Sequence, residues 1–342
     1  MYEKYLITII MPIYNSETYL PNTINSIINQ SIGFENIELI LIDDKSTDNS
    51  KFIIEKYASK YNNIIPIYLE NNSGYPGFVR NKGLEKSTSK YIMFIDSDDE
   101  YEVDMCETLY TIITENDCDC VESNFRFFDY LSKEENQKLN TSYEKTFLNP
   151  IDALYTSQLV IWNKIFKKSI LDSNNIKFVT DKIGEDGYFC IEYLINSKSM
   201  IFLEKYFGYK YFNREKSFTT SNLEWNLKVI KQHYEYLDFL NQKQIKLNMP
   251  LFFQNAIICS ISLVINIEEN DYKSVFQVLK ELYYFEKKID FTMERGSLIF
   301  RFINKFIENN HISIATRIIL VMNRIYNMKF IMKIYRQLLN IF

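Results

Sequence analysis

The chain has 342 residues, of which 46% are hydrophobic and 24% charged, so it can build globular cores and is long enough for two domains. Its formal net charge of −5 argues against nucleic acid as a partner, although it does not exclude a local basic patch. The only histidines are His233 and His311, which nearly excludes mechanisms that need a histidine triad or several histidine metal ligands.

Strands and helices alternate over about the first 130 residues. Continuous apolar runs predict buried strands, and segments with apolar residues at helical spacing predict the helices between them. The predicted strands are 5–14, 37–43, 64–70, 90–96 and 118–128, and the predicted helices are 15–31, 46–61, 77–87 and 102–116, with Asn15 or Ser16 and Ser46 as caps. This alternation predicts an α/β fold with a mostly parallel sheet covered on both sides. Ligands then bind beyond the carboxyl ends of the strands.

The rest of the chain divides by composition. Residues 130–150 are polar and read as a surface insertion, whereas 150–215 look like a continuation of the α/β domain. From residue 222 onward the pattern is helical. We therefore expect an α/β domain over 1–221 and a helical region over 222–342.

Three acids follow the predicted strand 90–96, in the segment "IDSDDE". Carboxylates two positions apart, such as Asp96 and Asp98, can share a divalent cation at a strand exit. Mg²⁺ and Mn²⁺ prefer a few carboxylates together with phosphate oxygens and water. The alternative is a solvated acidic turn, which the preceding buried strand makes less favourable.

A glycine-containing turn precedes the predicted helix 77–87, in "NNSGYPGFVRNKGL". Gly74 and Gly77 allow the backbone to approach a ligand closely, and the N-terminus of a helix favours the binding of an anion. Arg80, one turn inside, could reach a phosphate or the nearby acids. The segment is not a P-loop, because the G-K-[ST] ending is absent.

Other motifs have both a functional and a structural interpretation. Asp43 and Asp44 lie at the end of the predicted strand 37–43. One of these carboxylates could accept a hydrogen bond from a nucleobase N–H, or both could stabilise the N-terminus of the next helix. Glu185 and Asp186 open an amphipathic helix in "GEDGYFCIEYL", where a carboxylate is either a general base or a favourable N-terminal charge. Trp162 is either core or a platform for a sugar ring.

Six segments in order carry a family resemblance: "IIMPIYNSETYLPNTINSIINQS", "LILIDDKSTDNS", "NSGYPGFVRNKGL", "YIMFIDSDD", "WNKIFKKSIL" and "GEDGYF". Together they resemble the family 2 inverting glycosyltransferases with the GT-A fold, over about residues 5–220. More narrowly, the third segment with "GED" is similar to bacterial enzymes that glycosylate wall teichoic acid or build capsular polysaccharide.

The resemblance implies roles for residues in these motifs. Six of them would bind the donor nucleotide. Pro12 and Tyr14 would line its pocket, and Asp44 would bind the uracil. Asn72 and Arg80 would lie near the base and ribose, and Asp96 would contact the ribose or the metal. Asp98 would also ligate the metal, and Asp186 would be the general base with Glu185 beside it. Arg214, Lys216 and Ser217, in "YFNREKSFTTS", would belong to a loop that closes over the phosphates, although the same stretch also suits a plain linker.

The implied reaction is transfer of a sugar, with inversion, from a UDP-sugar to a hydroxyl of a glycan, polyol-phosphate or lipid-linked acceptor, with Mn²⁺ or Mg²⁺ as cofactor. The Q-x-x-R-W signature of processive membrane synthases is missing. A catalytically idle nucleotide-sugar binding protein is the main alternative. A nucleotidyltransferase ranks last, because "MPIYNSETYL" lacks the glycine and basic residues expected after the first strand.

The last part of the chain leaves two interpretations open. Residues 312–342 contain five basic residues and no acid, which suits either an anionic membrane surface or packing on the helical region. Region 222–342 is also a candidate for homo-oligomer contacts. No apolar run approaches a membrane-spanning length, and the five scattered cysteines read as reduced thiols. We expect a cytoplasmic protein, with peripheral contact to the inner face of the membrane as one option.

Overall fold

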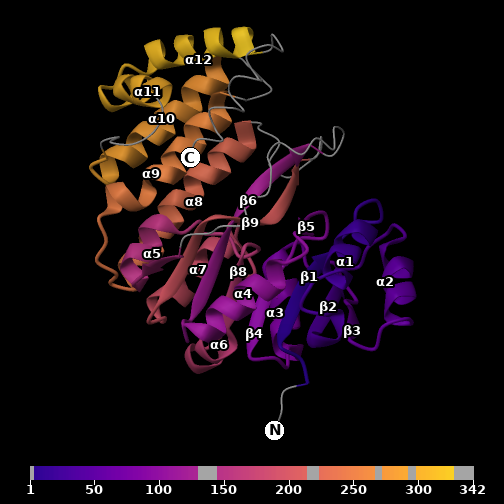
Figure 1. Cartoon of the computed structure of the whole chain (residues 1–342). Coiled ribbons are helices and arrows are strands. Elements are labelled where there is room, and N and C mark those ends of the chain that lie inside the picture. The colour runs from indigo at the N-terminus through magenta and orange to yellow at the C-terminus, as the bar shows by residue number, and fades with distance from the viewer. Residues whose placement is uncertain (1–3, 130–144, 214–222, 266–271, 292–297, 327–342) are drawn as a thin grey trace. The chain divides into compact units, whose positions relative to one another are not determined.

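The structure is a computed structural model that describes residues 4–129, 145–213, 223–265, 272–291 and 298–326. The chain forms two compact units, residues 1–214 and 215–342. Each unit is described by itself (Figure 1). The predicted domain boundary at 221/222 lies outside the described residues, and the division of roles between the two regions stays a prediction.

The first unit is built on a nine-stranded sheet with the order β3-β2-β1-β4-β8-β6-β9-β5, in which β7 also pairs with β9. The strands are β1 (Ile7–Ile13), β2 (Ile37–Asp43), β3 (Ile64–Tyr68), β4 (Tyr91–Phe94), β5 (Glu100–Tyr101), β6 (Cys120–Asp129), β7 (Lys145–Leu148), β8 (Lys164–Lys167) and β9 (Met200–Asn213). The first four strands pair in parallel, as the alternating pattern predicted. The later part of the sheet is mixed, because β8 runs antiparallel to both β4 and β6.

Helices cover both faces of this sheet (Figure 1). They are α1 (Leu20–Ile28), α2 (Ser50–Ala58), α3 (Pro76–Lys86), α4 (Met105–Glu115), α5 (Pro150–Thr156), α6 (Lys168–Asn174) and α7 (Glu185–Ile195), with a 3₁₀ turn at Phe34–Asn36. One core joins β1 to α1 and α4 through side chains such as Ile9, Ile24 and Leu109. On the other face, α3 lies so close to the sheet that a Cβ at Gly83 would meet Ile10.

The predicted helix caps are wrong. Helix α1 begins at Leu20 and has Tyr19 as its N-cap, and α2 begins at Ser50 after Asn49. Two of the three residues expected to cap, Asn15 and Ser46, instead tie two loops together. Asn15 Oδ1 accepts the Thr47 N–H at 2.8 Å, and Ser46 Oγ accepts the Asn15 N–H at 3.0 Å. These bonds join the loops that follow β1 and β2.

Strands β6 and β9 continue beyond the ends of β4 and β8. Val121 of β6 is level with Ile165 of β8, which is in turn level with Met93 of β4. Beyond that point, Asn124–Asp129 of β6 pair only with Phe207–Asn213 of β9. Strand β5 pairs with the other edge of this part of β9, through Glu100 with Lys210 and Tyr101 with Tyr209, so the extension lies beside the segment that follows β4.

The second unit is helical, with α8 (Leu223–Gln242), α9 (Met249–Ile265), α10 (Tyr272–Lys288), α11 (Leu298–Glu308) and α12 (Ile312–Tyr326). Leu279, Leu282 and Phe285 of α10 are fully buried in its core. Within the described ranges, no helix is both long and apolar enough to cross a bilayer.

Candidate active site

One arginine binds three carboxylates at the carboxyl end of the sheet. Arg80 of α3 is 3% exposed, and its Nη2 lies 2.7 Å from Oδ1 of Asp96, just past β4. Its Nη1 lies 2.7 Å from Oε1 of Glu185 and 3.1 Å from Oδ1 of Asp186. The structure thus brings together four residues that the sequence placed in three separate motifs.

The local sequence explains how the helices α3 and α7 reach this point. Gly77, in the first turn of α3, lies against the carbonyl of Val179, where a Cβ would clash. Gly184 adopts φ 72° and ψ 30° as the N-cap of α7, a conformation that glycine tolerates without strain. The guanidinium carbon of Arg80 lies 5.6 Å from the centre of the Phe178 ring. The arginine is therefore held by a ring as well as by charges.

The charges in this cluster do not balance, because three carboxylates share one guanidinium. Burial lowers the pKa of Arg80, but the charges of Asp186, Asp96 and Glu185 outweigh it and leave that pKa above its ordinary value. Burial raises the pKa of Asp186 to about 7, and the negative charges of Glu185 and Asp96 add to this effect against the opposing charge of Arg80. A carboxyl group that titrates near neutral pH is suited to general base catalysis.

A tyrosine from β9 fixes the acidic loop after β4. The Tyr209 hydroxyl donates to Oδ2 of Asp99 at 2.7 Å, and the Phe212 N–H donates to Oδ1 of Asp99 at 2.8 Å. The Asp96 N–H donates to the same Tyr209 hydroxyl at 3.4 Å. Burial raises the pKa of Asp99 well above its usual range, and the charge of Asp96 adds to it. Asp99 therefore anchors the loop to β9.

A second cluster lies at the ends of β1 and β2. Asp44 accepts the Ser73 N–H and the Ser73 hydroxyl, both at 2.8 Å, and its backbone carbonyl accepts from Nδ2 of Asn72 at 2.9 Å. Burial raises the pKa of Asp44, partly offset by the bonds from Ser73. Tyr14 follows β1 and is 51% exposed, and Pro12 is half-buried in β1. These four predicted residues therefore lie at neighbouring strand ends.

A hydroxyl pair links the loop after β1 to the acidic loop. Ser16 Oγ lies 2.6 Å from Ser97 Oγ and donates to the Tyr14 carbonyl at 3.2 Å. Ser97 stands between Asp96 and Asp98. The carboxyl ends of β1, β2 and β4 thus carry one connected set of polar groups, where an open α/β sheet binds its ligands.

A divalent cation fits part of this set. Asp96 and Asp98 offer carboxylate oxygens, the ligands that Mg²⁺ and Mn²⁺ prefer. The Asp96 side chain is 31% exposed, and its bond to Arg80 uses Oδ1. Among the described residues, no three His, Cys, Asp or Glu side chains form a metal-binding group. A cation here would complete its coordination with substrate oxygens and water.

Some predictions are not placed at the site. Arg214, Lys216 and Ser217 lie outside the described residues. Trp162 is 6% exposed and stacks on Tyr209 with ring centres 4.3 Å apart, so it is core and no platform for a sugar. Tyr209 was not among the predicted site residues, because no local motif marks it.

A buried ion pair supports the loop before β8. Nζ of Lys164 lies 3.3 Å from Oε2 of Glu122, and both side chains are 1% exposed. The same Nζ donates to the carbonyls of Gln158 at 2.6 Å and Val160 at 2.8 Å. The lysine of the "WNK" segment therefore shapes the backbone at 158–163.

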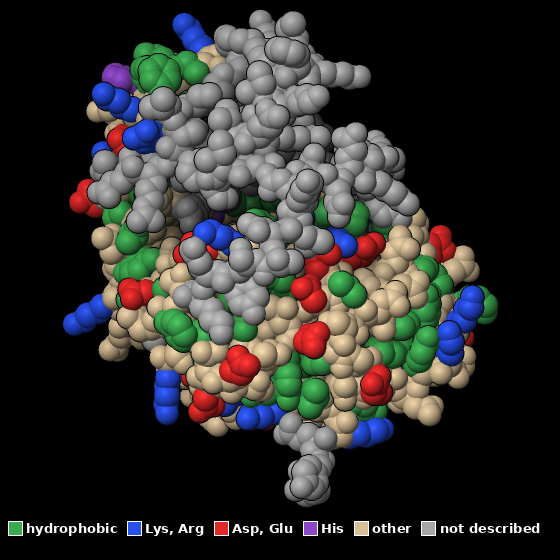
Figure 2. Space-filling model, in the orientation of Figure 1, with side chains coloured by type: hydrophobic (Ala, Val, Ile, Leu, Met, Phe, Trp, Pro, Cys, Tyr) green, Lys and Arg blue, Asp and Glu red, His purple; other side chains and the backbone are tan. Residues whose placement is uncertain are grey.

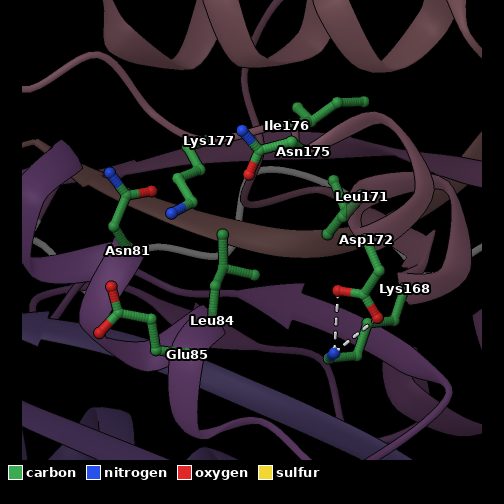
Figure 3. A pocket seen from close by; sticks show the side chains of 9 residues that line it. All are labelled: Asn81, Leu84, Glu85, Lys168, Leu171, Asp172, Asn175, Ile176 and Lys177. Carbon is green, nitrogen blue, oxygen red and sulfur yellow. Dashed lines mark hydrogen bonds and ion pairs between the residues drawn. The ribbon is translucent and has the colours of Figure 1, made fainter.

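The described part of the chain also has a cavity of about 320 Å³ that lies apart from these groups. Figure 3 shows its lining, which comes from α3, from α6 and from the residues after α6: Asn81, Leu84, Glu85, Lys168, Leu171, Asp172, Asn175, Ile176 and Lys177. Lys168 is paired with Asp172 at 2.8 Å, and Asn81 bonds to the backbone of Phe178. Its lining contains none of the predicted site residues, so we do not assign the nucleotide to it.

Comparison with known proteins places the chain in a family. The model of "Glycosyl transferase family 2" matches residues 8–174. Minor teichoic acid biosynthesis protein GgaA of Bacillus subtilis is 34% identical over 263 residues, which are 74% of this chain and 56% of that protein. Poly(ribitol-phosphate) beta-N-acetylglucosaminyltransferase TarP of Staphylococcus aureus is 33% identical over 220 residues, 63% of this chain and 64% of that protein. The chain thus spans less than two thirds of the length of either relative.

Solved structures agree on the fold. S. aureus TarS 1-349 in complex with UDP-GlcNAc has a TM-score of 0.64 at 21% identity, covering 95% of this chain and 92% of that one. The mannosyltransferase PcManGT from Pyrobaculum calidifontis, in complex with GDP-Man and Mn²⁺, has a TM-score of 0.52 at 12% identity, covering 94% and 86%. Residues 8–174 therefore belong to glycosyl transferase family 2, and the chain has the GT-A fold.

Proposed function

We propose that the chain is an inverting, metal-dependent glycosyltransferase. It would move a sugar from a UDP-sugar to a hydroxyl of a bacterial-type surface glycan or polyol-phosphate acceptor. The observation that carries this proposal is the Arg80 cluster, because it holds Asp186 and Glu185 beside the acidic loop of Asp96. The carboxylates that we propose as the base and as donor-binding acids are thus held at one end of the sheet.

The donor would lie across the strand ends. Asp44 and Asn72 would bind the uracil and ribose, with Pro12 and Tyr14 lining the pocket. The complex of TarS with UDP-GlcNAc supports a UDP-sugar of the hexose or N-acetylhexosamine kind. The acceptor class is supported by the name of TarP, a poly(ribitol-phosphate) glycosyltransferase.

Asp186 would act as the general base. Its carboxylate takes the proton of the acceptor hydroxyl, whose oxygen forms a bond to the anomeric carbon while the bond from that carbon to the UDP oxygen breaks. One displacement inverts the configuration. Arg80 and Glu185 keep the carboxylate in place. Mn²⁺ or Mg²⁺, held by Asp96 and Asp98, would neutralise charge on the leaving diphosphate.

For Arg80 we propose a different role from the one that the resemblance implied. The resemblance implied a position near the base and ribose, whereas its terminal nitrogens Nη1 and Nη2 are bonded to the three carboxylates. We infer that it positions Asp186 and Asp96 relative to each other. Any contact with the nucleotide would require it to give up one of these partners.

The test is UDP release from a panel of UDP-sugars with Mn²⁺, using the wild type, Asp186→Asn and Asp98→Ala. Release with one donor that is lost in both variants supports the proposal and identifies the sugar. Tight UDP binding without release from any donor, alone or with poly(ribitol phosphate), would instead favour the idle binding protein. Tyr284→Phe serves as a control, because it removes only a hydroxyl from a side chain that is 49% exposed on α10 and is not among the proposed site residues.

A further inference from the structure

The helical unit exposes apolar and basic side chains together on α11 and α12. Phe302 is 55% exposed and Ile314 is 45% exposed, although both are large hydrophobic residues. Arg301, Lys305 and Arg317 are exposed beside them in the sequence. We call these five residues the α11–α12 patch. The upper left of Figure 2 shows hydrophobic side chains with a histidine and Lys or Arg side chains around them, and Asp or Glu side chains below these.

The patch is not a loosely packed part of the core. Helix α11 buries Ile303, Asn304 and Ile307, and α12 buries Ile312, Ala315, Thr316 and Ile319. Helical periodicity places these residues opposite the patch residues of the same helix. The buried face of each helix therefore packs within the helical unit, and Phe302 and Ile314 lie on the opposite, exposed face.

The charge of the patch has one sign. The exposed residues described from 301 to 320 are Arg301, Phe302, Lys305, Asn309, Asn310, His311, Ser313, Ile314 and Arg317, with no acid among them. Glu308 is half-buried, and its Oε1 accepts a bond from Asn304 at 2.6 Å. In the sequence, no acid follows Glu308, whereas the whole chain carries a net charge of −5. Positive charge is thus concentrated at this end of the chain.

We propose that the α11–α12 patch binds an anionic membrane surface. Exposed lysines and arginines attract anionic lipid headgroups, and apolar side chains between them insert at the boundary of headgroups and acyl chains. A second copy of the chain fits less well, because a two-fold interface would bring patches of the same charge together. The proposal concerns where the protein lies and does not depend on the proposed reaction.

The experiment is sedimentation of the full chain with lipid vesicles. We expect it to bind vesicles of phosphatidylglycerol mixed with phosphatidylcholine, to bind pure phosphatidylcholine vesicles weakly, and to be released by high salt. Reversing two charges in Arg301→Glu/Lys305→Glu should weaken binding by about tenfold or more. Phe302→Ser should also weaken binding, because it removes an inserting ring.

Matched variants on α10 serve as controls. Lys280→Glu/Lys287→Glu makes the same change in charge at two exposed positions, and Tyr284→Ser removes a ring that is 49% exposed. Both should bind anionic vesicles as the wild type does. Circular dichroism of each variant separates loss of binding from loss of folding.

Three results would overturn the proposal. The first is a wild type that does not distinguish anionic from neutral vesicles. The second is an equal loss in the α10 controls, which would mean that net charge alone controls binding. The third is a wild type that forms dimers which Phe302→Ser disrupts, without vesicle binding, because that would assign the patch to a second copy.

Discussion

Nη1 of Arg80 lies 3.1 Å from Oδ1 of Asp186, although 106 positions separate the two residues in the chain. The same guanidinium lies 2.7 Å from Asp96 through Nη2. One side chain therefore connects α3, the end of β4 and the start of α7. The geometry of the candidate site depends on it.

Removing this arginine should destabilise the fold. In Arg80→Ala, three carboxylates lose their buried partner, and we expect the free energy of unfolding to fall by about 3 kcal/mol in urea titrations. Lys82→Ala is the control, since its pair with Glu85 is exposed and should contribute less than about 0.5 kcal/mol. Equal losses in the two variants would show that the cluster contributes no more than a surface ion pair.

The raised pKa of Asp186 predicts opposite effects of pH on rate and on stability. UDP release should rise as pH increases through about 7, because the base must lose its proton. Stability should fall as pH rises from the ordinary value of 3.8 to about 7, since over this range the folded protein holds a proton that the unfolded chain has released.

Two measurements check this. One is the pH profile of kcat/KM for UDP release, and the other is urea unfolding of the wild type and Asp186→Asn across the same range. The asparagine variant should lack this group's pH-dependent loss of stability. A wild-type rate that stays constant through neutral pH would contradict the role of Asp186 as the base.

The Tyr209 hydroxyl should affect the binding of Mn²⁺, because it holds the acidic loop in place. Tyr209→Phe removes the donor to Asp99 and the acceptor for the Asp96 N–H, so we expect several-fold more Mn²⁺ to be needed for half-maximal UDP release. Tyr101→Phe is a matched control, because its buried hydroxyl donates to the Phe94 carbonyl at 2.6 Å. Each variant should lose about 1–3 kcal/mol of stability, but only Tyr209→Phe should change the Mn²⁺ dependence.

The parts of the fold that could be predicted from sequence depend on local patterns. An apolar run such as 37–43 is enough to predict a strand, and the acids of "IDSDD" directly follow another such run. This accounts for the parallel half of the sheet and for the presence of carboxylates at its edge. The family resemblance added the roles, which no local pattern contains.

The contacts within the site could not be predicted, because they join distant segments. Tyr209 is 110 positions from Asp99, and the alternation of β9 marks it only as a strand residue. Asn15 and Ser46 were predicted as helix caps, since either side chain suits a helix start. In the structure their side chains instead form hydrogen bonds between the loops that follow β1 and β2. Arg80 was correctly expected near acids or phosphate, but the sequence does not show which partner it binds.

Lys164 and Glu122 should behave as a coupled pair. Lys164→Met leaves a buried carboxylate and should lower the free energy of unfolding by about 3–5 kcal/mol. The double variant Lys164→Met/Glu122→Leu should cost less than the sum of the two single changes, because it leaves no unpaired charge. Urea unfolding of the four proteins in this cycle gives the coupling energy, and additive losses would contradict a direct interaction.

The last prediction separates close packing at the site from close packing elsewhere in α3. Gly77→Ala would place a Cβ against the carbonyl of Val179 and 3.1 Å from Cγ of Glu185, whereas Gly83→Ala would place one against the side chain of Ile10. Both should lower stability, by about 1–3 kcal/mol each, because neither site has room for a methyl group. Only Gly77→Ala should also lower kcat for UDP release, because it displaces the segment that presents Glu185 and Asp186. Gly74→Ala is the control: its φ of 74° strains an alanine, but no atom lies within 4 Å of the added Cβ. If Gly83→Ala reduced kcat as much as Gly77→Ala, the rate would depend on the position of α3 as a whole and not on its contact with the start of α7.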